Sequence, residues 1–320
     1  PKARRVTMDM VSSALAAVGL GPRNKDQGAE FFVAPHKIDH GWEFVVDLPP
    51  GKTFADAAAK RDAIAGALNS KGDQLVLTED EDVERRVHFW LSDKDPYAAA
   101  PVRSPLAGVR KWNLWTKDVP FGITARGKRV VFPLLFTGVL IGSLPRMGKT
   151  VAFRDILAPA LLDPDVRLYI WDGKGGVDTL HAEKCSYRHG AGVSPAMVAL
   201  LAQSLQELLD DANARNARLR TMPEQCPDGR LTEALARNRR LAMPATGVFI
   251  DEVHRYLQHP VHGKDIAYLL QELAKVAPSV GISLVLSTQR PNAKLMDDGL
   301  RGSLGTRIAL KTASKTVSKM

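Results

Sequence analysis

The sequence predicts an α/β fold with a mostly parallel sheet, preceded by a small α+β domain. In residues 113–320, short apolar runs alternate with longer segments of helical periodicity, an order typical of a parallel sheet covered by helices. Runs such as Val248-Phe249-Ile250 are continuously apolar, which suits strands buried on both faces. Residues 1–100 instead mix short helices with strands of alternating polarity. A chain of 320 residues has room for two such domains.

The elements predicted in residues 1–100 have identifiable starts and ends. Thr7 can cap a helix that Gly19 ends, and a capping box begins at Thr53. Three prolines and three alanines in residues 96–105 predict a linker, which we assign to residues 101–112. The predicted elements are a helix over 7–18, a strand over 42–48, a helix over 53–68, and strands over 74–78 and 83–91.

The second domain is predicted to begin at residue 113. Its apolar runs predict strands over 138–141, 167–171, 247–250, 283–287 and 307–311. Its amphipathic segments predict helices over 149–162, 194–220, 231–238 and 264–277.

A phosphate-binding loop is predicted between the strand that ends near Ile141 and the helix that follows. Residues 141–150 read Ile-Gly-Ser-Leu-Pro-Arg-Met-Gly-Lys-Thr, which departs from the pattern G-x-x-x-x-G-K-[ST] at Ser143, where glycine is usual. The backbone N–H groups of such a loop and the helix N-terminus bind phosphate. Lys149 would neutralise the β- and γ-phosphates of ATP, and the hydroxyl of Thr150 would bind Mg²⁺. The predicted nucleotide-binding residues are Ser143, Leu144, Pro145, Arg146, Met147, Gly148, Lys149, Thr150 and Val151.

Polar side chains follow two further strands. The apolar run 247–250 ends in Asp251 and Glu252, and the run 283–287 is followed by Gln289. We expect Asp251 to hold Mg²⁺ and Glu252 to act as the base for the attacking water. Gln289 would contact the γ-phosphate or that water, because ligands of an open α/β sheet lie at the carboxyl ends of the strands.

These motifs resemble the motor domain of FtsK/SpoIIIE-type double-stranded DNA translocases, over residues 113–320. The loop looks most similar to the actinobacterial branch that includes TraB- and TraSA-like conjugative transfer proteins, and residues 1–100 resemble, less specifically, the region before the motor in that branch. The segments that carry the resemblance are Val-Pro-Phe-Gly at 119–122, the loop at 140–150, Trp-Asp-Gly-Lys-Gly at 171–175, Phe-Ile-Asp-Glu at 249–252, Ser-Thr-Gln-Arg-Pro at 287–291 and Thr-Arg-Ile-Ala-Leu-Lys at 306–311.

The resemblance implies a RecA-like motor that works as a homo-hexameric ring with double-stranded DNA in its channel. It implies ATP hydrolysis at subunit interfaces, completed by an arginine from the neighbouring subunit, for which Arg307 is the first choice and Arg290 and Arg301 are alternatives. The corresponding process is conjugative transfer of a plasmid or integrative element, or chromosome segregation. Membrane-associated transfer or division machinery would then be a further partner.

Charge and cysteine content agree with a polyanionic partner inside the cell. The net charge is +9, and part of the excess lies in residues 213–240 and 292–320. We expect Arg301 and Lys294 to contact DNA phosphates, although solvated helix faces explain single arginines equally well. The two cysteines fit a reducing compartment, and the longest uncharged apolar stretch, 13 residues at 130–142, is too short to span a membrane. A cytoplasmic location follows, and segments outside this chain would allow work at the inner face of the membrane, since a start at Pro1 without methionine suggests a fragment of a longer protein.

Three other interpretations compete with a DNA translocase. An EccC-like motor for protein secretion shares the same core, and no residue firmly separates the two, although net charge and the loop sequence favour DNA. A nucleotide-gated scaffold without catalysis is disfavoured by Glu252 and Gln289. Asp251-Glu252-Val253-His254 also spells a DExH helicase box, but the 66 residues after His254 are too few for a second helicase lobe.

Overall fold

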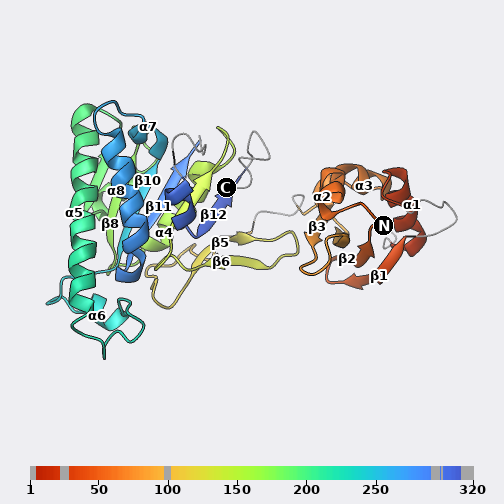
Figure 1. The fold of residues 1–320 in the computed structure, drawn as a ribbon, viewed down its shortest axis with the longest axis horizontal. Helices are drawn as coiled ribbons and strands as arrows, with labels where there is room; N and C mark the ends of the chain where they lie inside the picture. Colours follow the sequence, from red (N-terminus) through yellow and green to blue (C-terminus); the bar gives the residue numbers. More distant parts are fainter. Residues whose placement is uncertain (1–4, 22–28, 97–101, 290–295, 297, 311–320) are drawn as a thin grey trace. The chain divides into compact units, whose positions relative to one another are not determined.

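The computed structural model describes residues 5–21, 29–96, 102–289, 296 and 298–310 (Figure 1). The chain divides into two compact units, the first made of Pro1–Arg103 with Gly122–Val130 and the second of Ser104–Phe121 with Val131–Met320. The boundaries predicted from the sequence, with a linker over 101–112 and a motor from 113, stay predictions.

The first unit is an antiparallel sheet covered by helices, with strand order β1-β2-β4-β3. Phe44 on β2 stacks on Phe89 on β4, with ring centroids 5.1 Å apart, at the centre of its apolar core. The predicted helix over 53–68 is two helices, because the chain turns at Lys60, whose ammonium donates to the carbonyl of Val18 at 2.6 Å. The elements are α1 (Met8–Ala17), β1 (Glu30–Ile38), β2 (Gly41–Asp47), α2 (Phe54–Ala59), α3 (Arg61–Ala67), β3 (Leu75–Glu79) and β4 (Arg86–Ser92).

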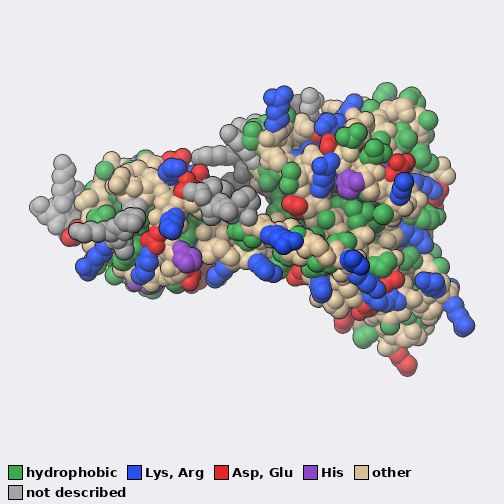
Figure 2. All heavy atoms as spheres, turned by 180° about the vertical axis from the view of Figure 1, so that it is seen from behind, with side chains coloured by type: hydrophobic (Ala, Val, Ile, Leu, Met, Phe, Trp, Pro, Cys, Tyr) green, Lys and Arg blue, Asp and Glu red, His purple; other side chains and the backbone are tan. Residues whose placement is uncertain are grey.

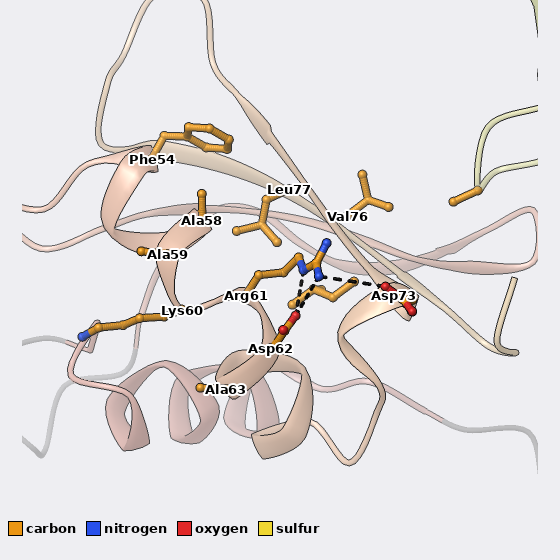
Figure 3. A pocket seen from close by; sticks show the side chains of 12 residues that line it. Phe54, Ala58, Ala59, Lys60, Arg61, Asp62, Ala63, Asp73, Val76 and Leu77 are labelled. Atoms are coloured by element: carbon orange, nitrogen blue, oxygen red, sulfur yellow. Dashed lines mark hydrogen bonds and ion pairs between the residues drawn. The ribbon is translucent and has the colours of Figure 1, made fainter. Parts of the chain in front are cut away.

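The first unit also holds a pocket of about 720 Å³ beside α2, α3 and β3 (Figure 3). Its wall combines apolar side chains, such as Phe54 and Leu77, with charged ones. Arg61 in this wall is paired with Asp62, their charged groups 2.8 Å apart. The predicted site residues all belong to the second unit, so this pocket is separate from them.

The second unit contains a six-stranded parallel sheet with the order β12-β7-β11-β10-β8-β9. The strands are β7 (Val139–Gly142), β8 (Arg167–Asp172), β9 (Arg188–Ala191), β10 (Thr246–Asp251), β11 (Ile282–Thr288) and β12 (Thr306–Ala309). The helices are α4 (Lys149–Leu161), α5 (Pro195–Leu219), α6 (Glu233–Arg237), α7 (Val253–Leu257), α8 (Gly263–Val276) and α9 (Asp298–Ser303). A separate two-stranded sheet pairs β5 (Val119–Ile123) with β6 (Arg129–Phe132). The predicted α/β fold with a mostly parallel sheet, preceded by a small α+β domain, is confirmed.

Helices cover both faces of the parallel sheet, and side chains alternate between the two faces along each strand. Val248 and Ile250 of β10 belong to the core cluster that contains the residues of α5 and α8. Phe249, between them, packs in the opposite cluster against Phe153 of α4, with ring centroids 5.9 Å apart. Figure 1 shows α5 and α8 lying together along one side of the sheet. This burial on both faces explains why the strands are continuously apolar in sequence.

The parallel register brings the carboxyl ends of the central strands to one edge of the sheet. Asp251 at the end of β10 lies opposite Asp172 of β8, and Ile250 lies opposite Leu286 of β11. Thr288, the last residue of β11, lies opposite Gly142 at the end of β7. The loop after β7 and the residues after β10 and β11 therefore start from the same edge.

One arginine of the basic segment 213–240 is a structural residue. Arg215 is 1% exposed, and its guanidinium donates to the carbonyls of Pro244 at 2.8 Å and Val280 at 3.1 Å. It also pairs with Asp211 at 2.8 Å. Arg215 therefore holds α5 to the start of the sheet and does not face a ligand.

We expect Arg215→Met to lower the free energy of unfolding by about 1.5–3 kcal/mol, because buried carbonyls lose a charged donor. The matched control is Arg220→Met, at an exposed position one turn further along, where we expect a change within about 0.5 kcal/mol. Urea denaturation of both variants checks this. Equal stability of the two variants would contradict the structural role.

The remaining basic side chains do not gather in one place on the face that Figure 2 shows, where Lys and Arg lie in several separate groups among acidic residues. Among the helices of the described residues, none is both long enough and apolar enough to cross a membrane.

Candidate functional site

The loop between β7 and α4 has the backbone shape that an anion site needs. Arg146 and Gly148 take left-handed conformations, with φ of 63° and 90°, and the residues from Pro145 to Gly148 are exposed. The 13-residue helix α4 begins directly afterwards, at Lys149. Exposed backbone N–H groups at a helix N-terminus favour a bound phosphate.

Ser143, which replaces the usual first glycine, fits this loop without strain. It is not among the described residues with positive φ, so the position does not require glycine. Its N–H donates to the carbonyl of Thr288 at 3.3 Å, and its hydroxyl donates to the carbonyl of Leu144 at 3.0 Å. The start of the loop is thus tied to the end of β11.

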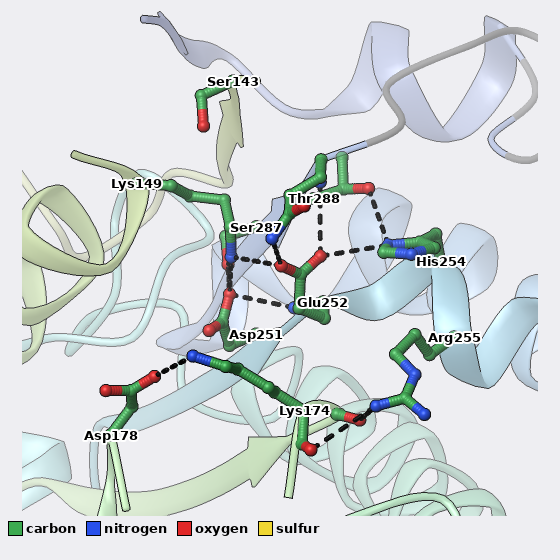
Figure 4. A network of polar contacts seen from close by, with 12 residues as sticks. Ser143, Lys149, Lys174, Asp178, Asp251, Glu252, His254, Arg255, Ser287 and Thr288 are labelled. Carbon is green, nitrogen blue, oxygen red and sulfur yellow. Dashed lines mark hydrogen bonds and ion pairs between the residues drawn. The ribbon is translucent and has the colours of Figure 1, made fainter. Parts of the chain in front are cut away.

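Lys149 lies between the carboxylate of Asp251, which ends β10, and that of Glu252, the next residue. The side chain is 5% exposed, and its ammonium donates to Oδ1 of Asp251 and lies 3.1 Å from Oε1 of Glu252 (Figure 4). The same ammonium is 3.4 Å from the hydroxyl of Ser287, which also donates to Asp251. Two carboxylates against one ammonium leave a local net charge of −1, which favours a further cation beside Asp251.

Glu252 occupies an unusual backbone position at the start of α7. Its φ of 51° and ψ of 44° are left-handed, a conformation that costs a non-glycine residue energy and clusters at functional sites. Burial raises the pKa of Glu252, but the hydrogen bond from His254 and the charge of Lys149 outweigh it and lower the pKa to about 2. Glu252 is therefore ionised at neutral pH, the form that can accept a proton.

Gln289, directly after β11, contacts the same carboxylate. Its backbone N–H lies 3.3 Å from Oε2 of Glu252, and its side-chain amide donates to Oε1. The structure thus brings together the start of α4 (Lys149), the end of β10 (Asp251 and Glu252) and the residue after β11 (Gln289), three places far apart in sequence.

The residues at this edge fit a magnesium nucleotide. Thr150 is the second residue of α4, and Asp251 ends the strand two positions across the sheet from β7. Hydroxyl and carboxylate oxygens are ligands that Mg²⁺ prefers when phosphate oxygens complete its shell. The exposed loop N–H groups supply the donors that phosphate needs.

Arg307, the predicted arginine finger, and Arg301, a predicted DNA contact, make their described contacts with each other and with Asp298. Arg307 is exposed on β12, which is the outermost strand beside β7 in the described part of the sheet, and its guanidinium donates to the carbonyl of Arg301 at 3.2 Å. Arg301 is half-buried on α9 and pairs with Asp298. Among the described contacts, neither arginine reaches Lys149, Asp251 or Glu252. Lys294 and Arg290 lie outside the described residues.

Sequence reasoning missed three contributors to the site: Ser287, Thr288 and His254. Ser287 and Thr288 follow the apolar run Leu284-Val285-Leu286 at the end of β11, and that change in polarity is the signal that could have revealed them. In the sequence, His254 stands out only as the last residue of a possible helicase box.

A second polar network joins the same edge to α4 and α7. Lys174, from the Gly-Lys-Gly segment after β8, pairs with Asp178 at 3.1 Å, which also pairs with Arg154 of α4 at 3.1 Å. Arg255 of α7 donates to the carbonyl of Gly173 at 2.7 Å (Figure 4). These contacts hold the loop after β8 against the elements that carry the candidate site.

Comparison with known proteins finds sequence similarity over a limited stretch. No protein-family profile matches the chain. The DNA translocase FtsK of Caulobacter vibrioides is 38% identical over 73 residues, which are 23% of this chain and 9% of that protein. The DNA translocase FtsK of Rickettsia bellii is 34% identical over 77 residues, 24% of this chain and 10% of that protein. The chain thus matches about a tenth of the length of these relatives, and the resemblance to FtsK-type translocases is confirmed over that stretch.

Two solved structures share the fold. The pCW3 conjugation coupling protein TcpA, in a monomer form with ATPγS, superposes with a TM-score of 0.55 at 16% identity, over 98% of this chain and 85% of that chain. The cytoplasmic domain of EssC superposes with a TM-score of 0.51 at 14% identity, over 64% of this chain and 39% of that chain. The fold predicted for the second unit, a mostly parallel sheet covered by helices, is confirmed, and both of these proteins share it.

Proposed function

We propose that this chain is an ATP-hydrolysing motor that moves double-stranded DNA, in conjugative transfer or chromosome segregation. The observation that carries the proposal is the 34–38% identity to FtsK DNA translocases, in a chain whose sheet edge joins Lys149, Asp251, Glu252 and Gln289. The TcpA fold match supports the conjugative branch.

The geometry supports a division of labour among these residues. Lys149 and the loop from Ser143 to Val151 bind the phosphates of ATP, while Thr150 and Asp251 hold Mg²⁺. Bound Mg²⁺ would offset negative charge that develops on the phosphate oxygens. Glu252, ionised and held between Lys149 and Gln289, accepts a proton from the attacking water.

The proposal includes a ring of identical subunits. Arg307 is exposed on the outermost strand in the described part of the sheet, so it can reach a neighbouring subunit and contribute positive charge to that subunit's γ-phosphate. A hexamer would enclose DNA, with Arg301 and Lys294 among its phosphate contacts. In the cell this motor would work in the cytoplasm, with membrane-associated machinery as its partner.

A protein-secretion motor is the second candidate, because EccC-like motors share the core that the sequence resembles and no residue firmly separates the two. Its cargo would be a polypeptide, so DNA would leave its ATP turnover unchanged. The two candidates therefore differ in one measurable property.

We expect double-stranded DNA to raise ATP turnover by about fivefold or more, the lower end of the coupling between two ligand sites. The stimulation should weaken as salt rises, because contacts to DNA phosphates release counterions. The measurement is steady-state ATP hydrolysis with and without DNA, at several salt concentrations.

Absence of DNA stimulation together with absence of DNA binding at low salt would contradict the translocase proposal. Basal hydrolysis that DNA does not change would favour the secretion motor. Lack of hydrolysis in all conditions, with no nucleotide binding, would contradict both candidates.

A further inference from the structure

His254 contacts the carboxylate proposed as the catalytic base. It lies in the first turn of α7, and its side chain is 11% exposed. Its Nδ1 atom is 3.1 Å from Oε2 of Glu252 and 3.2 Å from the hydroxyl oxygen of Thr288. Figure 4 shows the ring directed towards both side chains.

The position of Oε2 of Glu252 beside Nδ1 determines which nitrogen of His254 carries a proton. A lone pair on Nδ1 would face the negative charge on Oε2 at 3.1 Å, whereas an N–H there makes a charge-assisted hydrogen bond. Nδ1 is therefore protonated, and Thr288 can share the same N–H through its hydroxyl oxygen.

The contact completes a chain of bonds around the carboxylate. Oε1 of Glu252 accepts from Lys149 and the Gln289 side chain, and Oε2 accepts from His254 and the Gln289 backbone. Lys149 is predicted to contact the phosphates of ATP, and Gln289 the γ-phosphate or the attacking water. Both can therefore replace their hydrogen bond to Glu252 with one to these groups when ATP binds. His254 is directed at Glu252 and Thr288 alone among its described contacts.

The same imidazole connects two strand ends. Glu252 follows β10, Thr288 ends β11, and the carbonyl of Thr288 accepts from Ser143 at the start of the phosphate loop. Because His254 contacts both Oε2 of Glu252 and Thr288, it fixes the position of Glu252 relative to the loop proposed to bind ATP. Small displacements of a catalytic group cost large factors in rate.

We propose that His254 is a positioning residue that holds Glu252 in place for catalysis through the Nδ1–H to Oε2 hydrogen bond. This inference rests on the proposed function as an ATPase. It gives His254 a role unlike that in a helicase box, because it acts through the carboxylate and needs no second lobe.

Two substitutions separate positioning from packing. His254→Phe keeps the ring and removes the donor, and we expect the maximal rate of ATP hydrolysis to fall about tenfold to a hundredfold, with the Michaelis constant changed by less than about threefold. His254→Asn places an amide N–H close to the position of Nδ1, and we expect it to restore the rate to within about threefold of wild type. His181→Phe, at an exposed histidine, is the matched control and should leave the rate unchanged.

Each outcome of these assays decides the proposal. A wild-type rate in His254→Phe overturns it. A rate in His254→Asn as low as in His254→Phe also overturns it, since the effect would then come from lost packing. Hydrolysis by the wild type must be measured in parallel, because its absence would contradict the proposed function and not the hydrogen bond.

A measurement independent of turnover tests the hydrogen bond itself. In ¹⁵N NMR spectra of histidine-labelled protein, with His254→Phe used to assign the signal, we expect a protonated Nδ1 in the wild type. Glu252→Gln should shift that signal. An unprotonated Nδ1, or a signal that does not respond to Glu252→Gln, would overturn the proposal even if the enzyme showed no activity.

Discussion

Glu252→Gln will lower the maximal rate of ATP hydrolysis by about two to four orders of magnitude while nucleotide binding persists. The amide keeps the shape of the side chain but cannot take the proton of water. The amide also has one acceptor oxygen where the carboxylate has two. Either the donors at Oε1 (Lys149 and the Gln289 side chain) or the donors at Oε2 (His254 and the Gln289 backbone) therefore lose their acceptor. The measurement is single-turnover hydrolysis beside equilibrium binding of a fluorescent ATP analogue.

The matched control is Glu272→Gln, on α8, where the carboxylate pairs with Lys275 away from this edge. It should hydrolyse ATP at the wild-type rate. A Glu252→Gln variant with more than about a tenth of wild-type turnover would show that another group is the base, and the assignment of Glu252 would be wrong.

Lys149→Ala is expected to abolish measurable ATP binding and to lower the free energy of unfolding by about 3–5 kcal/mol. The first effect is expected because the variant lacks the charge that we propose binds the β- and γ-phosphates. The second follows because Asp251 and Glu252, 1% and 3% exposed, would keep their negative charges without the ammonium between them. Isothermal titration with ATP and urea denaturation measure the two effects separately.

Lys264→Ala removes the same charge from an exposed position on α8 and should change neither quantity. Full turnover in Lys149→Ala would contradict the site assignment. Unchanged stability with lost ATP binding would contradict the electrostatic account alone, and would indicate that one of the two carboxylates becomes protonated in the variant.

The fold of the second unit was predictable because its central strands are short, continuously apolar runs that can be recognised in the local sequence. The run Val248-Phe249-Ile250 is apolar because both faces of β10 are covered, and its end is marked by Asp251 and Glu252. Parallel strands end at one edge, so the order of motifs along the chain was enough to predict that they meet.

Elements without such a signal were missed. In β1 the half-buried row of Phe31, Val33, Pro35 and Ile38 is apolar, but a proline inside the run disfavours a strand and the pairing with β2 is irregular. The turn at Lys60 stands in a run of good helix formers, and there the ammonium contacts the carbonyl of Val18, a residue 42 positions away. A long-range contact of this kind has no local signature.

The partners of Glu252 were unpredictable for a related reason. With this left-handed backbone, the carboxylate contacts Gln289, directly after β11, and His254 of α7, which in turn contacts Thr288 at the end of β11. Local propensity disfavours that conformation for glutamate, so only the surrounding contacts explain it.

The alternation of β10 between two apolar layers also sets how precisely the acidic pair is placed. Sliding the strand by one residue would move Asp251 by about 3.3 Å and direct Phe249 into the layer that Val248 and Ile250 now fill. Packing against the helices on both faces therefore fixes the position of the carboxylates along the strand, and any change of register would be a whole residue. We therefore expect substitutions of core residues around β10 to change the rate of ATP hydrolysis, even at positions distant from the proposed nucleotide site.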